Sequence, residues 1–223
     1  MALKGKRIVI TGGAGVLGQG VARVANQQGA DVVLLDVVAP QADAIGEYVS
    51  VDLTDQASLT ACFDHIGDFD VLANIAGGFA MGPCVYETED ELWDAMFTIN
   101  VTTLRRVLHV AVPRLLARGR GSVVNVGALG ALKGWPNMGA YLASKSVVMR
   151  LTESLSEEVK NAGVNVNAVL PTVIDTPRNR ADMPAADPSN WVDPEDLGNV
   201  ICFLGSDAAK AVHGALVPVN GLS

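Results

Sequence analysis

Short apolar segments alternate with longer amphipathic segments along the whole chain. The short segments are rich in valine, leucine and isoleucine, which is typical of strands buried on both faces of a sheet. They are Arg7–Thr11, Asp31–Asp36, Tyr48–Val51, Phe69–Asn74, Ser122–Gly127, Val164–Leu170 and Ala215–Val219. Strands that alternate with helices form a parallel sheet, because each crossover helix returns the chain to the same edge. The sequence therefore predicts an α/β fold, with a doubly wound parallel sheet of about seven strands and helices on both faces.

The longer segments carry residues that begin and end helices. Asp193 precedes Pro194, which combines an N-cap with a proline at the first helical position. Thr88 precedes a run of acidic residues and is predicted to cap another helix. Gly29 is predicted to end the first helix as a C-cap. The later helices are predicted over Gln56–His65, Glu89–Ala117, Met138–Ala162 and Pro194–Ser206.

The composition limits the classes of partner. With 223 residues, of which 49% are hydrophobic and 18% charged, the chain suits one compact domain over residues 1–223. A formal net charge of −8 argues against nucleic acid as a partner. The apolar runs are too short to span a membrane, and the cysteines form no Cys-x-x-Cys pair. We therefore expect a soluble cytoplasmic protein with free thiols, no metal and a small-molecule substrate.

A glycine-rich turn, Thr11-Gly12-Gly13-Ala14-Gly15-Val16-Leu17-Gly18, joins the first strand to the first helix. Backbone N–H groups in such a turn, together with the helix N-terminus, can approach a pyrophosphate. Asp36 ends the second strand, where a carboxylate accepts hydrogen bonds from the adenosine ribose and repels a 2′-phosphate. This pattern favours NAD(H) over NADP(H) as the cofactor. The alternative is that Asp36 is an ordinary turn residue at the end of its strand.

Tyr141 and Lys145 lie one helical turn apart in Tyr-Leu-Ala-Ser-Lys. Both side chains are therefore predicted to project from the same face of their helix. A phenol beside a cation has a lower pKa than a free phenol, because the charge stabilises the phenolate. Next to a dinucleotide site, the pair indicates proton transfer by an oxidoreductase.

The chain resembles the short-chain dehydrogenase/reductase family from end to end. The motifs that carry the resemblance are Thr11-Gly12…Gly18, Asp52-Leu53, Asn74-Ile75-Ala76-Gly77, Asn100, Tyr141-x-x-x-Lys145, Pro171…Thr176 and the final strand from Gly214 to Val219. The resemblance implies a Rossmann-type fold and NAD(P)-dependent hydride transfer. In this family a tyrosine exchanges the substrate proton, and a lysine lowers the tyrosine pKa and holds the nicotinamide ribose. An asparagine kinks the preceding helix and holds a water in a proton relay. Tyr141, Lys145 and Asn100 match these catalytic positions.

The resemblance also implies which residues hold the cofactor. The glycine turn would hold the phosphates, the ends of the third and fourth strands would border the adenosine, and the residues after the sixth strand would surround the nicotinamide. The implied contacts are Gly12, Gly15, Val16, Leu17, Gly18, Asp36, Asp52, Leu53, Asn74, Ala76, Gly77, Tyr141, Lys145, Pro171, Val173 and Thr176. Val16 departs from the family pattern, which has glycine or alanine there, and Thr172 replaces the usual glycine after the proline.

Position 128 departs further from the family pattern. The family has a serine at this position that hydrogen-bonds the substrate oxygen, and here the residue is Ala128. Loss of a donor aimed at developing negative charge weakens transition-state stabilisation. Dihydropteridine reductases, a branch of the family, also carry alanine there, and the segment from Leu170 to Trp191 is similar to their loop after the sixth strand. In that branch NADH reduces a quinonoid pterin, with tyrosine as the proton donor.

The residues are thus compatible with several functions. One is hydride transfer between nicotinamide and a small carbonyl or alcohol, the second is reduction of a quinonoid pterin, and the third is a non-catalytic NAD sensor. The intact catalytic residues argue against the sensor. Ala128, Phe79 and Trp191 are predicted to face the substrate, which the loop over 171–193 is predicted to cover. Helices over 101–117 and 147–159 are apolar on more than one side, and the resemblance implies that they form a homodimer or homotetramer.

Overall fold

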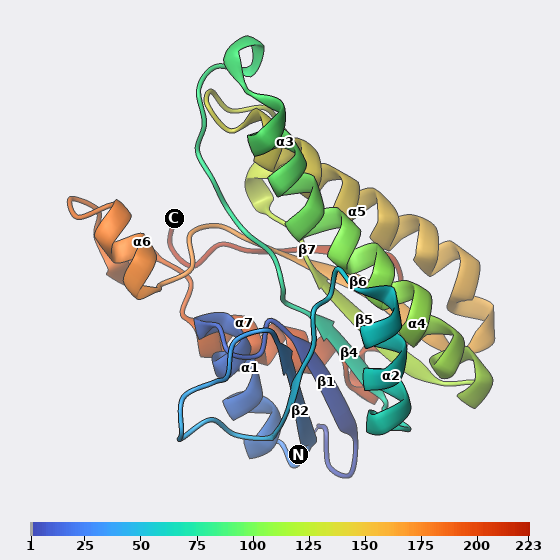
Figure 1. Ribbon diagram of the computed structural model, residues 1–223. Coiled ribbons are helices and arrows are strands. Elements are labelled where there is room, and N and C mark those ends of the chain that lie inside the picture. Colours follow the sequence, from blue (N-terminus) through green and yellow to red (C-terminus); the bar gives the residue numbers. More distant parts are fainter. Residues whose placement is uncertain (1) are drawn as a thin grey trace.

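The computed structural model describes residues 2–223 and contains a seven-stranded sheet with the order β3-β2-β1-β4-β5-β6-β7 (Figure 1). All neighbouring strands are parallel. The strands are β1 (Arg7–Thr11), β2 (Asp31–Asp36), β3 (Glu47–Ser50), β4 (Val71–Asn74), β5 (Gly121–Val126), β6 (Val164–Pro171) and β7 (Leu216–Val219). The predicted Rossmann-type sheet is confirmed.

Helices cover both faces of the sheet, with α1 and α7 on one face and α2, α4 and α5 on the other (Figure 1). The helices are α1 (Val16–Gln27), α2 (Gln56–Ile66), α3 (Asp90–Phe97), α4 (Thr103–Arg118), α5 (Gly139–Val159), α6 (Pro177–Asp182) and α7 (Pro194–Leu204). Successive strand residues point to opposite faces. Ile8 and Ile10 accordingly pack with α1 and α7, whereas Val9 packs with α2 and α4. These two apolar layers fix the sheet between the helices.

The helix predicted over Glu89–Ala117 is interrupted. A π-helical turn at Thr98–Thr102 separates α3 from α4. Thr88 does not cap α3, since its hydroxyl donates instead to the Cys84 carbonyl at 3.1 Å. The predicted Asp193 cap is confirmed, because its carboxylate accepts the N–H of Glu195 at 2.7 Å. The π-helical turn contains Asn100, which matches a catalytic position of the family that the sequence resembles.

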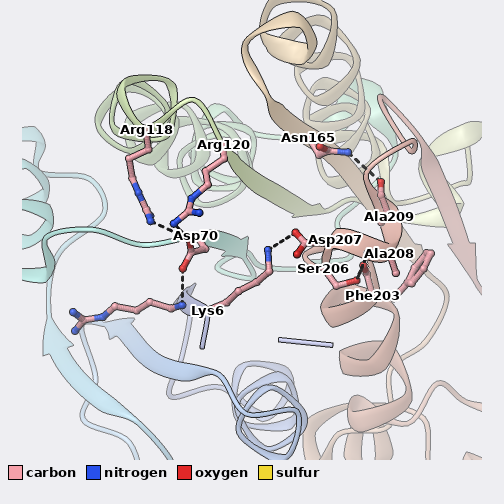
Figure 2. Close-up of polar contacts among 11 residues, drawn as sticks. Lys6, Asp70, Arg118, Arg120, Asn165, Phe203, Ser206, Asp207, Ala208 and Ala209 are labelled. Atoms are coloured by element: carbon pink, nitrogen blue, oxygen red, sulfur yellow. Dashed lines mark hydrogen bonds and ion pairs between the residues drawn. The ribbon is translucent and has the colours of Figure 1, made fainter. Parts of the chain in front are cut away.

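A polar network joins the amino ends of the strands (Figure 2). Asp70, just before β4, accepts the backbone N–H of Arg7 and the guanidinium of Arg118, each at 3.0 Å. The Asp70 side chain is only 15% exposed, so these bonds replace water around a largely buried carboxylate. The pair between Lys6 and Asp207 measures 2.7 Å, but its carboxylate is 89% exposed and contributes little. This edge of the sheet is therefore held together by polar bonds.

The predicted functional residues lie at the opposite edge, where the strands end. Thr11 of β1 is in register with Leu35 of β2 and Asn74 of β4. The chain runs outward from β1 in both directions, so a crevice at the carboxyl ends of β1 and β4 is the position where such folds bind ligands. Within residues 2–223, no helix is both long and apolar enough to cross a membrane.

Candidate cofactor and active site

The glycine turn after β1 is too tight for side chains. A Cβ atom on Gly18 would lie 2.3 Å from the Gly12 carbonyl oxygen, and one on Gly12 would lie 2.9 Å from the Ala76 backbone nitrogen. No side chain in residues 2–223 caps α1, whose N-cap is Gly15. The first backbone N–H groups of the helix are thus not bonded to a capping side chain. A cradle of this kind fits the pyrophosphate of a dinucleotide.

Asp36 is tied to this turn. One carboxylate oxygen accepts the N–H of Ala14 at 3.0 Å, and the other accepts the N–H of Val38 at 3.2 Å. Each carboxylate oxygen can accept more than one hydrogen bond, so the group keeps capacity for ribose hydroxyls. Asp36 therefore bonds the turn, as the reading of it as a turn residue expects, and its carboxylate lies beside the glycine turn.

Buried side-chain bonds fix the loop that follows β4. The Thr11 hydroxyl oxygen accepts the N–H groups of Ile75 and Ala76 at 3.1 and 3.2 Å. Asn74 donates to the Asn125 side chain at 2.9 Å. The loop is thus bonded to β1, next to the β4–β5 pair that Asn74 and Asn125 join, and Ala76 lies beside Gly12 of the glycine turn.

Lys145 is buried beneath this loop. Its ammonium group donates to the Val126 carbonyl at 2.8 Å, and the residue is 6% exposed. Burial lowers the pKa of Lys145 to about 8, because desolvation disfavours the charged form. A Cβ atom on Gly77 would lie 2.8 Å from the Asn100 side-chain oxygen and 3.2 Å from the Lys145 nitrogen, so glycine lets the loop approach both side chains closely.

Tyr141 lies one turn before Lys145 on α5. Burial raises the pKa of Tyr141 to about 12, which is opposite to the direction expected from the Tyr–Lys pair alone. The reason is that desolvation of the phenolate dominates, while the ammonium of Lys145 is directed at the Val126 carbonyl. The phenol therefore remains protonated at neutral pH and can donate a proton.

Asn100 connects the loop after β4 to the helix that carries Tyr141. It lies in the π-helical turn and is 2% exposed. Its side-chain oxygen accepts the N–H of Gly78, and its amide nitrogen donates to the Gly78 carbonyl, both at 3.0 Å. The amide also donates to the Ser144 hydroxyl at 3.1 Å, which in turn donates to the Tyr141 carbonyl at 2.7 Å. One amide thereby fixes the positions of two active-site segments.

The predicted substrate residues occupy different environments. Phe79 follows the clamped Gly78, is 39% exposed, and packs edge-on against Tyr141 with the ring centroids 4.9 Å apart. Ala128, just after β5, lies in an apolar cluster with Leu142 and is 6% exposed. Trp191 is 9% exposed at the return of the 171–193 loop. Phe79 and Ala128 thus lie near the phenol, whereas the buried position of Trp191 suits support of the loop.

The remaining predicted contacts are at the same edge of the sheet. Asp52 follows β3 and accepts both the N–H and the hydroxyl of Thr54 at 2.7 Å, and these bonds lower the pKa of Asp52. Pro171 is the last residue of β6, and the Val173 carbonyl accepts a hydrogen bond from the N–H of Val192. The Thr176 side chain caps the N-terminus of α6. A cavity of about 10 Å³ is lined by several of the predicted residues, namely Leu53, Asn74, Ala76, Asn100 and Lys145.

Sequence reasoning missed several groups that organise this site. Ser144 stands between Tyr141 and Lys145 and links Asn100 to α5, a role that its position three residues after Tyr141 could have suggested. The Val126 carbonyl and the Gly78 backbone carry no sequence signal, because every residue has these groups. Their roles follow only from the long-range packing of β5 and the loop after β4.

Comparisons with known proteins show the family of this chain. The family model described as enoyl-(acyl carrier protein) reductase matches residues 12–221. A cis-4-hydroxycyclohexanecarboxylate dehydrogenase from Sinomonas cyclohexanicum is 33% identical, over 96% of this chain and 94% of its own. The chain therefore belongs to the short-chain dehydrogenase/reductase family of NAD(P)-dependent oxidoreductases.

Solved structures of similar proteins hold either form of the cofactor. A putative 2-deoxy-D-gluconate 3-dehydrogenase from Agrobacterium tumefaciens, with bound NADP, has a TM-score of 0.89 and 30% identity, covering 99% of this chain and 96% of its own. Carveol dehydrogenase from Mycobacterium avium, in complex with NAD, has a TM-score of 0.86 and 26% identity, covering 99% of this chain and 98% of its own. Membership of the family thus leaves the choice between NAD and NADP to the residues of this chain.

Proposed function

We propose that the protein catalyses hydride transfer between NAD(H) and a small carbonyl or alcohol, with Tyr141 as the acid/base. The observation that carries the proposal is the partly buried, protonated phenol of Tyr141, one helical turn from Lys145 on a helix that Asn100 contacts through Ser144. Small alcohols or carbonyls are also the substrates named for the relatives. Residues 1–223 would act as one cofactor-binding domain, with the loop over 171–193 next to the substrate.

The cofactor fits the residues that are present. The glycine turn would hold the pyrophosphate, Asp36 the adenosine ribose and Lys145 the nicotinamide ribose. Lys145 has further N–H donors beyond its bond to Val126, and an ammonium can donate three hydrogen bonds. When bound, the nicotinamide supplies or accepts the hydride.

Tyr141 completes the reaction by moving a proton. In carbonyl reduction, its O–H donates to the substrate oxygen as negative charge develops there. Lys145, one helical turn away, would stabilise the phenolate that results, and Asn100 holds the backbone of Tyr141 through Ser144. Because the pKa of Tyr141 is about 12, the phenol is in its donating form at neutral pH, as carbonyl reduction requires.

We propose NAD(H) as the preferred cofactor because of Asp36. Its carboxylate lies at the end of β2, bonded to Ala14 of the glycine turn. A 2′-phosphate at this position would meet a like charge, whereas ribose hydroxyls would meet an acceptor.

The test is oxidation of NADH by the purified protein, with a panel of aldehydes and ketones beside a quinonoid dihydropterin. Turnover with a carbonyl at a rate well above background is the expected result. Binding of NADH without turnover of any substrate would contradict the proposal and favour a sensor.

Reduction of a quinonoid substrate is the second candidate, and Ala128 is the observation that favours it. This residue lies in an apolar cluster and supplies no hydroxyl to a substrate oxygen. A quinonoid ring can accept hydride without a charged carbonyl oxygen, so it depends less on such a donor. Turnover with the dihydropterin alone would support this candidate over the first.

We also propose that the protein is a homodimer or homotetramer, in which α4 and α5 pair with a second copy. A groove of about 360 Å³ between these helices is lined partly by the apolar residues Leu108, Val112, Leu151 and Leu155. Sedimentation analysis tests this proposal. The variant Leu108→Glu should shift the protein toward monomers, and an unchanged assembly would contradict this interface.

A further inference from the structure

The segment Asn220–Ser223, which follows β7, lies against the residues that begin and end the 171–193 loop. In Figure 1 its end is close to the chain that leads to α6. The segment itself is exposed, with Leu222 at 83%. Its contacts are therefore made by hydrogen bonds at the surface and not by burial in the core.

Thr172 forms one side of this contact. Its backbone N–H donates to the Val219 carbonyl at 3.2 Å, and its hydroxyl donates to the Asn220 carbonyl at 2.8 Å. The Ser223 hydroxyl lies 2.9 Å from the Thr172 hydroxyl. Only the hydroxyl bonds depend on the side chain, so glycine at position 172 would keep the backbone bond alone.

Asn190 and Trp191, near the end of the 171–193 loop, form the other side of the contact with Asn220–Ser223. The N–H of Leu222 donates to the Asn190 carbonyl at 2.9 Å. Gly221 has a φ of +58°, and a Cβ atom there would lie 2.8 Å from the Asn190 carbonyl oxygen and 3.0 Å from that of Trp191. Glycine is required here both by the backbone conformation and by the close approach.

Between these points the loop is bonded to itself. The N–H of Val192 donates to the Val173 carbonyl, and the N–H of Asp175 donates to the Val192 carbonyl, both at 2.9 Å. Beyond this pairing, α6 buries none of its residues. Side-chain bonds join α6 to the start of the loop, since Arg180 donates to Asp175 at 2.6 and 2.7 Å and Asn179 donates to the Ile174 carbonyl at 2.7 Å. The position of α6 relative to the rest of the molecule therefore depends on how the base of the loop is held.

We propose that Thr172 and the segment Asn220–Ser223 form a clasp that positions the 171–193 loop over the nicotinamide end of the cofactor. This inference rests on the proposed function, because Val173 and Thr176, which would contact the nicotinamide, lie one and four residues after Thr172. Thr172 acts through the loop and is a positioning residue. Gly221 is a second one, since it lets the segment reach Asn190.

The test compares Thr172→Val, which removes the hydroxyl at nearly constant size, with Thr172→Ser, which retains it. The full-length protein is digested briefly with trypsin, and cleavage after Arg178 and Arg180 is followed by mass spectrometry. NADH affinity is measured by fluorescence titration of the same samples. Thr60→Val is the matched control, because it removes a hydroxyl that donates to the Gln56 carbonyl at 2.9 Å on the exposed side of α2.

Thr172→Val should increase both the cleavage rate and the NADH dissociation constant by about fivefold, the factor that corresponds to one net hydrogen bond of about 1 kcal/mol. Thr172→Ser and Thr60→Val should behave as the wild type, and Gly221→Val should reproduce the Thr172→Val result. Unchanged cleavage in Thr172→Val, or faster cleavage with unchanged NADH affinity, would overturn the proposal. If the wild type turns over no substrate, the proposed reaction fails, while cleavage and binding still decide the clasp.

Discussion

The buried ammonium of Lys145 should make the protein less stable at neutral pH than at alkaline pH. Its pKa of about 8 in the folded protein lies below the ordinary value of 10.5, because desolvation penalises the charge. Between about pH 8 and pH 10.5 the unfolded chain binds more protons than the folded one. Stability therefore rises as the pH rises through this window, and the full penalty is present below pH 8.

The size of the effect follows from the difference between the two pKa values. A difference of about 2.5 corresponds to about 3 kcal/mol at about 1.4 kcal/mol per pKa unit. Lys145→Met removes this penalty but leaves the Val126 carbonyl without its donor, which costs roughly 1–3 kcal/mol at every pH. The absolute stability of the variant thus depends on two opposing effects, whereas its pH dependence reports the ammonium alone.

The assay is urea unfolding of wild type and Lys145→Met without cofactor, at intervals from pH 7 to pH 10.5. The stability of the variant relative to wild type should fall by about 3 kcal/mol across this range. Burial raises the pKa values of Cys62, Cys202 and Tyr141, so these groups destabilise both proteins at high pH and cancel in the difference.

Lys160→Met is the control, since it removes an exposed lysine that pairs with Glu157 at 2.6 Å just beyond α5. Its difference from wild type should stay within about 0.5 kcal/mol at all pH values. A Lys145→Met difference that is equally flat would refute the reasoning, because it would mean that the ammonium is solvated in the folded protein.

Other side chains give predictions of the same kind. Asp36→Asn should reduce the ratio of the NADPH to the NADH dissociation constant by about tenfold or more, since it removes the charge that opposes the 2′-phosphate. Asp43→Asn, on the neighbouring exposed loop, is the control. An unchanged ratio in Asp36→Asn would show that another residue sets the preference. Asn100→Ala should lower kcat by about 100-fold with little effect on NADH affinity, because Gly78 and Ser144 lose their hydrogen-bond partner. An equal loss of kcat and of NADH affinity would point to general unfolding. Asp70→Ala should destabilise the protein by about 1–3 kcal/mol in urea unfolding without altering KM. Asp68→Ala removes a side chain that is 85% exposed and should have almost no effect. Equal free energies of unfolding for the two variants would contradict the role of Asp70.

The sheet could be predicted from the sequence because its signals are local. Runs such as Val32-Val33-Leu34-Leu35 suit only buried strands, and glycine or aspartate marks where they end. The alternation with helices then allows few topologies. The position of Asp36 beside the glycine turn follows from the pairing of β1 with β2, although its bond to Ala14 does not.

The features that could not be predicted depend on contacts between distant segments. The family resemblance implies a kink at Asn100, but the π-helical turn that forms it contains neither glycine nor proline. The Asn100 amide within this turn is held by Gly78, 22 residues earlier. The pKa of Tyr141 depends on how far Phe79 and the loops bury it, which no local pattern reveals. Thr172 could be recognised as unusual in the sequence, but its bond to Asn220 spans 48 residues.

The most direct measurement of the proposed chemistry is single-turnover oxidation of bound NADH by Tyr141→Phe and wild type, using the carbonyl that wild type reduces fastest. The account predicts that the variant binds NADH as tightly as wild type but transfers hydride about 100- to 10,000-fold more slowly, because the phenol is the proton donor. Hydride transfer at the wild-type rate in Tyr141→Phe would contradict the account, since the proton would then come from another group.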